Sequence, residues 1–411
     1  MKPALGPAAP VRSSQRFVIL DALRGFALLG IALANFPEFS LYTFLNANAV
    51  EAMPTYGLDR VVRFLQYLFI DGKFYTIFSL LFGIGFSIIL SNAEKKGVDG
   101  FKVFYRRMGV LVFIGFLHLM FIWSGDILML YALLGLLLPL FRRLSDKKLL
   151  AWAFALLALP VLVDGIQEFG HFSLSAPVVR WQQHWCAEFG ITEANFAYWL
   201  RDAKDYGEVF QFLIQGALVR VQEFIDGNRY FKVLGLFLIG FYLGRNRVYA
   251  DLADRKDWLR KVFRFGLWVG LPLSLLYAWS ALNHQLWGTT LHSLLYLVSV
   301  FPLGFAYVAG ICLLYLRRSQ WKIFSWFVAP GRMALSNYIG QSLIGMFLFY
   351  GIGLGLGASL GLAQVEGIVF LVFIVQMLLS RAWLSVFRFG PLEWGWRMLT
   401  YGRYFKLRSE A

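Results

Sequence analysis

The sequence predicts an all-α fold, a polytopic integral membrane bundle of about ten transmembrane helices with both termini in the cytoplasm. Of the 411 residues, 59% are hydrophobic and only 15% are charged, which is more apolar than the composition of ordinary soluble domains. Many apolar stretches approach the ~20 residues that a helix needs to cross a bilayer. Lys and Arg gather in alternate connections between those stretches, as the positive-inside bias requires.

Apolar length and polar breaks divide the chain into ten spans. A helix is expected in each, because lipid offers backbone polar groups no hydrogen-bond partners. The spans are expected at residues 17–37, 67–91, 104–123, 126–141, 149–167, 229–244, 262–281, 288–315, 323–350 and 363–387. The first apolar run is too long for the core of a secretion signal, so we expect it to remain as a helix.

The basic residues orient this bundle. With the N-terminus inside, 28 of the 39 Lys and Arg residues fall in cytoplasmic segments, the side that positive residues favour. We therefore expect a multi-pass protein of the bacterial inner membrane with membrane lipids as partners. The net charge of +15 does not indicate a nucleic-acid partner, because the basic residues flank apolar runs and form no basic soluble face. A homo-oligomer is compatible with the sequence.

Four segments follow from these spans. They are a cytoplasmic tail at 1–16, the first five spans at 17–167, an extracytoplasmic loop at 168–228 and a C-terminal transmembrane domain at 229–411. Within the loop, the stretch from Tyr206 to Asp226 alternates with helical period, which predicts an amphipathic helix. This helix either lies flat on the outer leaflet or belongs to a structured loop, and the sequence leaves both open.

The first span carries polar residues that are costly in lipid and therefore candidates for function. Asp21 and Arg24 are three residues apart on one helix face, which predicts either a structural ion pair or a functional pair. Asn35 follows Arg24 by three turns, so it lies on the same face about 16 Å along the axis.

The third span repeats this spacing. Arg107 stands at its cytoplasmic end, and His118 follows eleven residues later. The segment 123–126 has room only for a tight turn, so Asp126 is expected beside His118. A carboxylate beside a histidine predicts a general base, because it orients the ring and stabilises the imidazolium. The alternative is a structural histidine bonded to a neighbouring helix.

The ninth span is rich in hydrogen-bonding side chains. Asn337 and Gln341 share a helix face at four-residue spacing, which predicts either a polar site or a polar helix contact. No metal site is expected, because His171 and His184 are thirteen residues apart without further ligands at zinc spacing.

Several motifs resemble one family of membrane proteins. The segment LDALRGFALLG at 20–30, followed by Asn35, resembles the first helix of the transmembrane acyltransferase superfamily. Five further segments are similar to the YeiB family: DGKF at 71–74, GFLH at 115–118, GDIL at 125–128, GRMALSNY at 331–338 and GPLEW at 390–394. The last two resemble the C-terminal domain of unknown function of that family. The chain is therefore identified as a member of a YeiB-like family.

The resemblance implies an activity. The superfamily is related to heparan-alpha-glucosaminide N-acetyltransferase, which moves an acetyl group from cytosolic acetyl-CoA to a sugar amine across the lysosomal membrane. By this resemblance, the protein is a membrane acyltransferase. It would use acetyl-CoA or another acyl-CoA from the cytoplasm to acylate an extracytoplasmic hydroxyl or amine of a glycan or small molecule.

The same resemblance, read with the chemistry of the residues, assigns the roles. The wider branch has a histidine eleven residues after the first-helix arginine, and here that place is Asn35, so His118 becomes the expected base, oriented by Asp126. Asn35 or Asn337 is expected to stabilise the oxyanion. Guanidinium groups match phosphate geometry, which places the donor at the arginines. The donor-binding candidates are Arg24, Arg106, Arg107, Lys73, Arg332, Ser336 and Gln341.

Two other functions compete with acyl transfer. One is a transporter or flippase whose buried polar groups line a substrate path, although the sequence shows no repeat and no pair of Gly- or Pro-broken helices in matching halves. The other is a membrane protein without catalysis, in which the polar residues serve helix packing alone.

Overall fold

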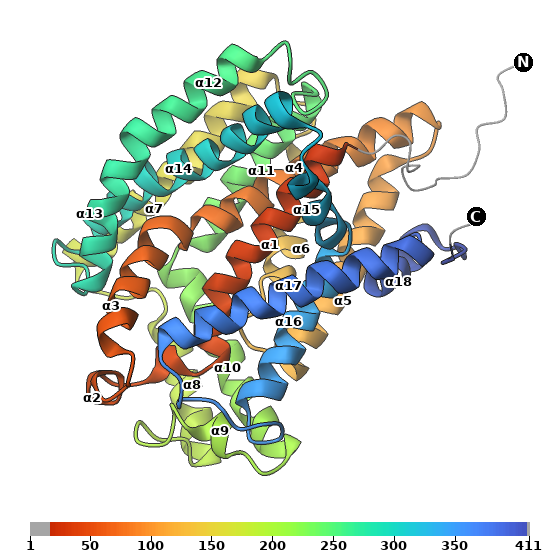
Figure 1. Ribbon diagram of the computed structural model, residues 1–411. Helices are drawn as coiled ribbons and strands as arrows, with labels where there is room; N and C mark the ends of the chain where they lie inside the picture. Colours follow the sequence, from red (N-terminus) through yellow and green to blue (C-terminus); the bar gives the residue numbers. More distant parts are fainter. Residues whose placement is uncertain (1–16, 409–411) are drawn as a thin grey trace, which may run out of the picture.

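The computed structural model of the protein describes residues 17–408 and shows an all-α membrane helical bundle (Figure 1). Within these residues, the only extended pairing is an isolated bridge between Phe387 and Arg408. The predicted all-α membrane bundle is confirmed, while the number of ten spans and the side of the termini stay predictions. The predicted tail at 1–16 lies outside the described residues.

Seven helices in the described part of the chain are long and apolar enough to cross a membrane. They are Val18–Phe39 (α1), Tyr56–Lys95 (α3 and α4), Gly100–Phe121 (α5), Asp146–Gly170 (α7), Lys256–Leu282 (α12 and α13), Thr289–Arg318 (α14) and Leu362–Val386 (α17). Each coincides with one of the ten predicted spans, because hydropathy reports the apolar surface that a lipid-facing helix must present.

The other three predicted spans lie on shorter helices. Residues 126–141 form α6, Leu128–Gly135, and a 3₁₀ turn, Leu138–Phe141, while residues 229–244 form α11, Arg229–Arg245. The structure corrects the prediction of one continuous helix over 323–350. This segment consists of α15, Lys322–Arg332, and α16, Ala334–Phe349, which meet at Met333.

The break at Met333 has one cause nearby and one far away in the sequence. Pro330 lies in the last turn of α15, where its missing N–H leaves the Trp326 carbonyl oxygen without its helical donor and weakens the turn. The Glu393 carboxylate accepts hydrogen bonds from the backbone N–H groups of Leu335 and Ser336, at 2.7 and 3.0 Å. The first turn of a helix leaves such groups unpaired. Glu393 therefore fixes where α16 begins.

Replacing Glu393 by alanine is expected to lower the stability of the bundle by ~1–3 kcal/mol, because buried N–H groups of α16 lose their acceptor. Glu393 lies in α18, Pro391–Tyr401, and is buried. Thermal unfolding of the purified protein in detergent checks this prediction. Glu393→Gln keeps one carbonyl acceptor, so its unfolding temperature is expected to lie between those of the wild type and Glu393→Ala. A Glu393→Ala variant as stable as the wild type would show that α16 starts without this cap.

Helix α1 lies inside the bundle, where it contacts α4, α15, α16 and α17 (Figure 1). It approaches α15 backbone to backbone, because Gly25 and Gly331 carry no side chains at the crossing. Asp21 is buried and Arg24 is half-buried. These two polar residues therefore face protein.

The long helix Tyr56–Lys95 is interrupted at Gly72. Helix α3, Tyr56–Leu65, continues into a π-helical turn, Gln66–Ile70, and α4 starts only at Lys73. Gly72 has a φ of 75°, a conformation that glycine adopts without steric cost. A β-carbon at this position would also lie 2.3 Å from the Tyr296 hydroxyl. The interruption places the π-helical turn against α13, Leu271–Leu282.

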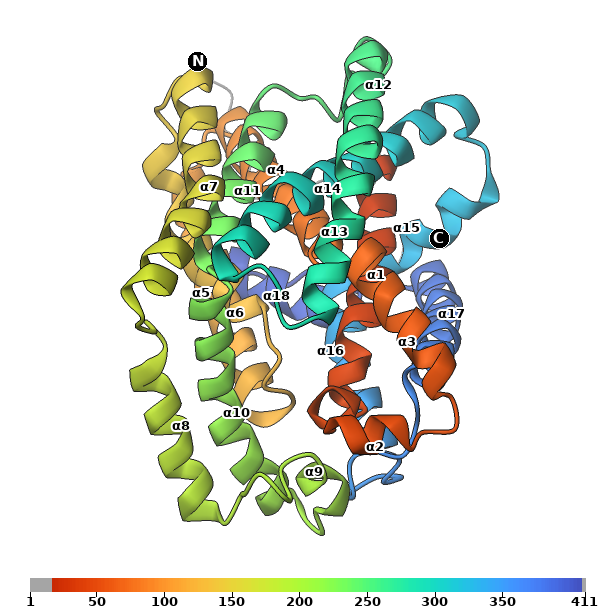
Figure 2. The same ribbon diagram turned by 90° about the vertical axis from the view of Figure 1, so that its left-hand side faces the viewer.

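The segment 168–228 is folded and helical. It contains α8, Ala176–Phe189, α9, Trp199–Asp202, and α10, Tyr206–Asp226, which has the bounds of the predicted amphipathic helix. Helix α10 packs against α8, α5 and α11, and Figure 2 shows α8 and α10 side by side at one end of the bundle. These contacts favour a structured loop over a helix lying alone on the leaflet.

The two ends of the bundle differ in character. We call the end formed by α8, α9 and α10 the loop end. The opposite end, where α1 begins and where Arg24, Arg107 and Arg332 lie, is called the arginine-rich end. This naming is independent of which end faces the cytoplasm.

Candidate functional site

His118 is the centre of the candidate site and lies one turn before the end of α5. It is only 1% exposed, as is Asp126. The Nδ1 atom of His118 lies 2.9 Å from Oδ1 of Asp126, and its Nε2 atom lies 2.8 Å from Oγ of Ser342. The second carboxylate oxygen of Asp126 accepts a hydrogen bond of 2.7 Å from the Met129 backbone N–H. The result is a buried Ser–His–Asp chain built from α5, α16 and the turn after α5.

The local sequence explains how Asp126 reaches the imidazole. After α5 ends, the backbone N–H groups of Ile122 and Trp123 both bond to the carbonyl oxygen of His118, which closes the helix tightly. Helix α6 then folds back along α5 at Gly115, where a β-carbon would lie 2.5 Å from the Met129 backbone nitrogen. The glycine therefore permits the close approach that brings Asp126 beside the ring.

Aromatic rings enclose the imidazole. The ring of Tyr338 lies 5.2 Å from that of His118, and the ring of Trp123 lies 6.1 Å away. Tyr338 is one helical turn before Ser342 on α16, so one face of α16 supplies both contacts. The aromatic walls keep the surroundings of the Asp126–His118 pair apolar, which strengthens electrostatic interactions there.

An arginine from the loop closes the site at the loop end. The Arg220 guanidinium of α10 pairs with Glu38 at 3.2 Å and with Glu223 at 2.6 Å, and it donates to the Ser124 carbonyl oxygen at 3.0 Å. It also lies 5.7 Å from the centre of the Trp123 ring. Arg220 on α10 therefore contacts both α1 and the turn that carries Asp126.

Sequence reasoning missed Ser342, Arg220 and Glu38. A signal for Ser342 was its position four residues after Tyr338, within a span already rich in polar groups. A signal for Arg220 was its place on the predicted amphipathic helix, between apolar residues. Neither signal identifies the partner, because the contacts join residues far apart in the sequence.

The arginine-rich end brings together several donor-binding candidates. Arg24 pairs with Asp21 at 2.5 Å. The Arg107 guanidinium lies 3.6 Å from the centre of the Trp396 ring, and its electrostatic neighbours include Arg24 and Glu393. Arg24 and Arg107 therefore belong to one basic region beside α18.

Two further arginines line the same end. Arg106 is exposed and borders Gly402, and Arg332 donates to the Arg388 carbonyl oxygen at 3.2 Å. Ser336 also lies here, but its hydroxyl donates to Glu393 at 2.6 Å. Each guanidinium group has five N–H donors, so the contacts of Arg24 and Arg332 leave further N–H groups for a ligand. The single hydroxyl proton of Ser336 is used in the α16 cap.

Two other candidates form a polar ladder between α16 and α17. The Asn337 amide donates to Ser380 at 2.9 Å, and the Asn337 carbonyl oxygen accepts from Gln376 at 2.9 Å. Gln341 donates to the Gln376 side chain at 2.9 Å. This is the polar helix contact that the sequence left open as an alternative.

Lys73 and Asn35 lie apart from these groups. Lys73 begins α4, while the other end of this 23-residue helix leads to α5 at the arginine-rich end. Its ammonium donates to the Tyr67 carbonyl oxygen at 2.7 Å. Asn35 is half-buried on α1. It makes no contact with the imidazole nitrogens, which are both engaged by other partners.

Both interpretations of His118 have a counterpart in this geometry. The bond to Asp126 is the one a general base needs for orientation. The bond to Ser342 is the one that a structural membrane histidine makes to a neighbouring helix.

Comparison with known proteins places the whole chain in one family. Residues 243–403, from the end of α11 through α18, match a family described as "Protein of unknown function (DUF418)". The chain is 30% identical over 405 residues to "Uncharacterized protein YxaH" of Bacillus subtilis (strain 168), which covers 95% of this chain and 96% of the relative. It is 28% identical over 410 residues to "Uncharacterized protein YeiB" of Escherichia coli (strain K12), and the match covers 94% of this chain and 96% of the relative. The chain belongs to the YeiB-like family of multi-pass membrane proteins that carry the DUF418 domain.

Proposed function

We propose that the protein is a transmembrane acyltransferase of the bacterial inner membrane. It moves an acyl group, such as acetyl, from a CoA-type donor at the arginine-rich end to a hydroxyl or amine acceptor, such as a glycan, that arrives from the loop end. In this proposal the arginine-rich end faces the cytoplasm. The observation that carries it is the buried His118 imidazole held by Asp126 at 2.9 Å.

The chemistry assigned to His118 is that of a general base. The acceptor oxygen or nitrogen attacks the thioester carbonyl carbon, and its proton passes to the imidazole. The carbon–sulfur bond then breaks, the imidazolium gives the proton to the sulfur, and CoA leaves as the thiol. Asp126 orients the ring and stabilises the imidazolium that forms. The Ser342 hydroxyl, 2.8 Å from the second ring nitrogen, marks the position that the acceptor hydroxyl or amine takes. Ser342 is displaced from the ring when the acceptor binds.

The donor is assigned to the arginines. One guanidinium group can bind two oxygens of a phosphate at once. Four such groups lie at the arginine-rich end, on Arg24, Arg106, Arg107 and Arg332. Ser336, Gln341 and Lys73 are engaged with protein groups. We therefore leave these three out of the donor site.

Acetyl-CoA is expected to bind the purified protein, and Arg107→Ala and Arg24→Ala are each expected to weaken binding by ~10–100-fold, the loss of one hydrogen bond to a charged group. Isothermal titration calorimetry in detergent measures this. Arg260→Ala is the matched control, because Arg260 is exposed and pairs with Asp257 in its own helix. Absence of binding by the wild type would exclude the acyltransferase.

A transporter remains the second candidate, and the structure adds one observation in its favour. The helix Tyr56–Lys95 is interrupted at Gly72, and the predicted ninth span is interrupted at Met333. Discontinuous helices bind substrates and ions in many transporters. The two interruptions lie in the second and ninth predicted spans, so they do not by themselves form the pair in matching halves that the sequence lacks. Uptake of a small solute into proteoliposomes, with no binding of acetyl-CoA, would support transport.

A further inference from the structure

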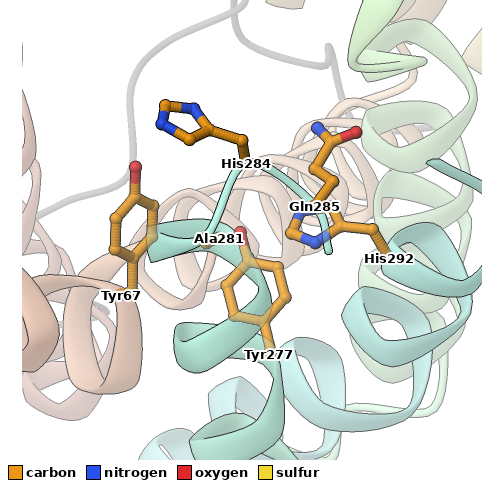
Figure 3. Close-up of a pocket in the computed structure, with 6 residues that line it drawn as sticks. All are labelled: Tyr67, Tyr277, Ala281, His284, Gln285 and His292. Carbon is orange, nitrogen blue, oxygen red and sulfur yellow. The ribbon is translucent and has the colours of Figure 1, made fainter. Parts of the chain in front are cut away.

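A polar cavity of about 400 Å³ lies away from the His118 site, between the turn before α4, the end of α13 and the start of α14 (Figure 3). It is lined by Tyr67, Tyr277, Ala281, His284, Gln285 and His292. Its volume is in the range of small-molecule sites. None of the candidate residues of the acyl-transfer proposal lines this cavity.

A half-buried carboxylate and a buried ammonium group contact the aromatic walls of the cavity. The Tyr277 hydroxyl donates to Asp71 at 2.5 Å, which fixes the ring. The Lys73 ammonium lies 5.2 Å from the centre of the Tyr277 ring, and it donates to the backbone of Tyr67 at 2.7 Å. Lys73 is completely buried. Its charge therefore contacts the face of the Tyr277 ring and holds the backbone that carries Tyr67.

One imidazole in the wall is fixed in the same way. His292 Nδ1 lies 3.1 Å from the Ser280 hydroxyl, and the His292 ring packs against that of Tyr277 with 4.9 Å between centres. These contacts occupy one nitrogen of the ring. Among residues 17–408 the other nitrogen has no hydrogen-bond partner, which leaves it for a ligand.

The turn that joins α13 to α14 is held in an unfavourable conformation over the cavity. His284 and Gln285 have φ values of 50° and 59°, in a region that costs energy for residues other than glycine. The Gln285 N–H donates to the Ser280 carbonyl oxygen at 2.8 Å, which maintains the turn. Figure 3 shows the side chains of both residues among those that line the cavity. Such outliers concentrate at ligand-binding sites.

The lining determines the class of ligand. Its polar groups are two phenols, two imidazoles and one amide, with no carboxylate, ammonium or guanidinium among the six lining side chains. Imidazole, amide and phenol groups donate and accept hydrogen bonds, and aromatic rings offer flat apolar faces. A sugar ring presents hydroxyl groups at its edge and C–H groups on its faces. We propose that this cavity binds an uncharged sugar ring.

This proposal is independent of acyl transfer, because it uses neither His118 nor the arginines. The test is saturation-transfer NMR with the full-length protein in an amine-oxide detergent, since maltoside or glucoside detergents would themselves supply a sugar. Glucose and N-acetylglucosamine are expected to give saturable signals. Glycerol, which has hydroxyl groups and no ring face, is expected to give none. A stronger signal from glucose 6-phosphate than from glucose would overturn the assignment to an uncharged ligand.

Two variants test the site itself. His284→Gly and Gln285→Gly remove a lining side chain where glycine accepts the backbone conformation, so each is expected to fold normally and to bind sugar ~3–10-fold more weakly. Leu286→Gly is the matched control on the same exposed turn, outside the lining, and is expected to bind as the wild type does. Equal signals from the wild type and both lining variants would overturn the proposal.

Discussion

His118→Ala is expected to lower the rate of acyl transfer by ~10²–10⁴-fold, the usual contribution of a general base, while acetyl-CoA still binds. The variant loses the only imidazole held by Asp126 and leaves the arginine-rich end intact. Release of CoA in the presence of an acceptor amine or glycan, measured in proteoliposomes, gives the rate. A rate equal to that of the wild type would make His118 a structural residue.

The controls separate chemistry from folding. His118→Ala also deprives the buried Asp126 carboxylate of its partner, which by itself destabilises a protein. His118→Gln keeps hydrogen-bonding groups near Asp126 and Ser342 without a basic nitrogen. It is expected to unfold close to the wild-type temperature and to be as slow as His118→Ala. An active His118→Gln variant would contradict the general base.

Ser342→Ala tests whether the serine bonded to His118 takes part in the chemistry. Our assignment treats the Ser342 hydroxyl as the occupant of the acceptor position, so its removal is expected to change the rate by less than about tenfold, the equivalent of one neutral hydrogen bond. The same assay measures it. A loss as large as that of His118→Ala would show that Ser342 takes part in the chemistry, and our assignment would then be wrong.

The long helices were predictable because membrane insertion depends on a local property. Seven predicted spans coincide with helices long enough to cross a membrane, since about 20 apolar residues suffice to specify each one. The broken span at Met333 was not predictable in this way. Its start is fixed by Glu393, which lies 58 residues from Leu335 in sequence and is brought there by α18. Hydropathy carries no information about such a distant cap.

The candidate site was partly predictable for the same reason. His118 and Asp126 meet because a tight turn follows α5, and spacing alone indicates this. Ser342 meets His118 only because α16 has a particular rotation about its axis, which the break and the packing of α1 determine. The sequence likewise could not show that Asn337 and Gln341 face α17, because a polar face on a helix does not identify its neighbour.

Gly25→Ala and Gly331→Ala are each expected to reduce stability by at least ~1–3 kcal/mol, the usual cost of overpacking a core. A β-carbon at Gly25 would lie 1.9 Å from the Phe327 carbonyl oxygen, and one at Gly331 would lie 1.9 Å from the Asp21 carbonyl oxygen. Both obstructing atoms are backbone atoms, so relief requires α1 and α15 to separate. That separation would move Arg24 relative to α15 and weaken donor binding as well.

The measurement is the thermal unfolding temperature in detergent, with Gly367→Ala as the matched control. Gly367 lies within α17 and has nothing within 4 Å of an added β-carbon, so alanine there is expected to be neutral or stabilising. The double variant at Gly25 and Gly331 is expected to lose less than the sum of the two single losses, because one separation of the helices relieves both clashes. Additive losses would mean that the two glycines act at independent contacts, and unchanged unfolding temperatures would mean that α1 and α15 do not touch through their backbones.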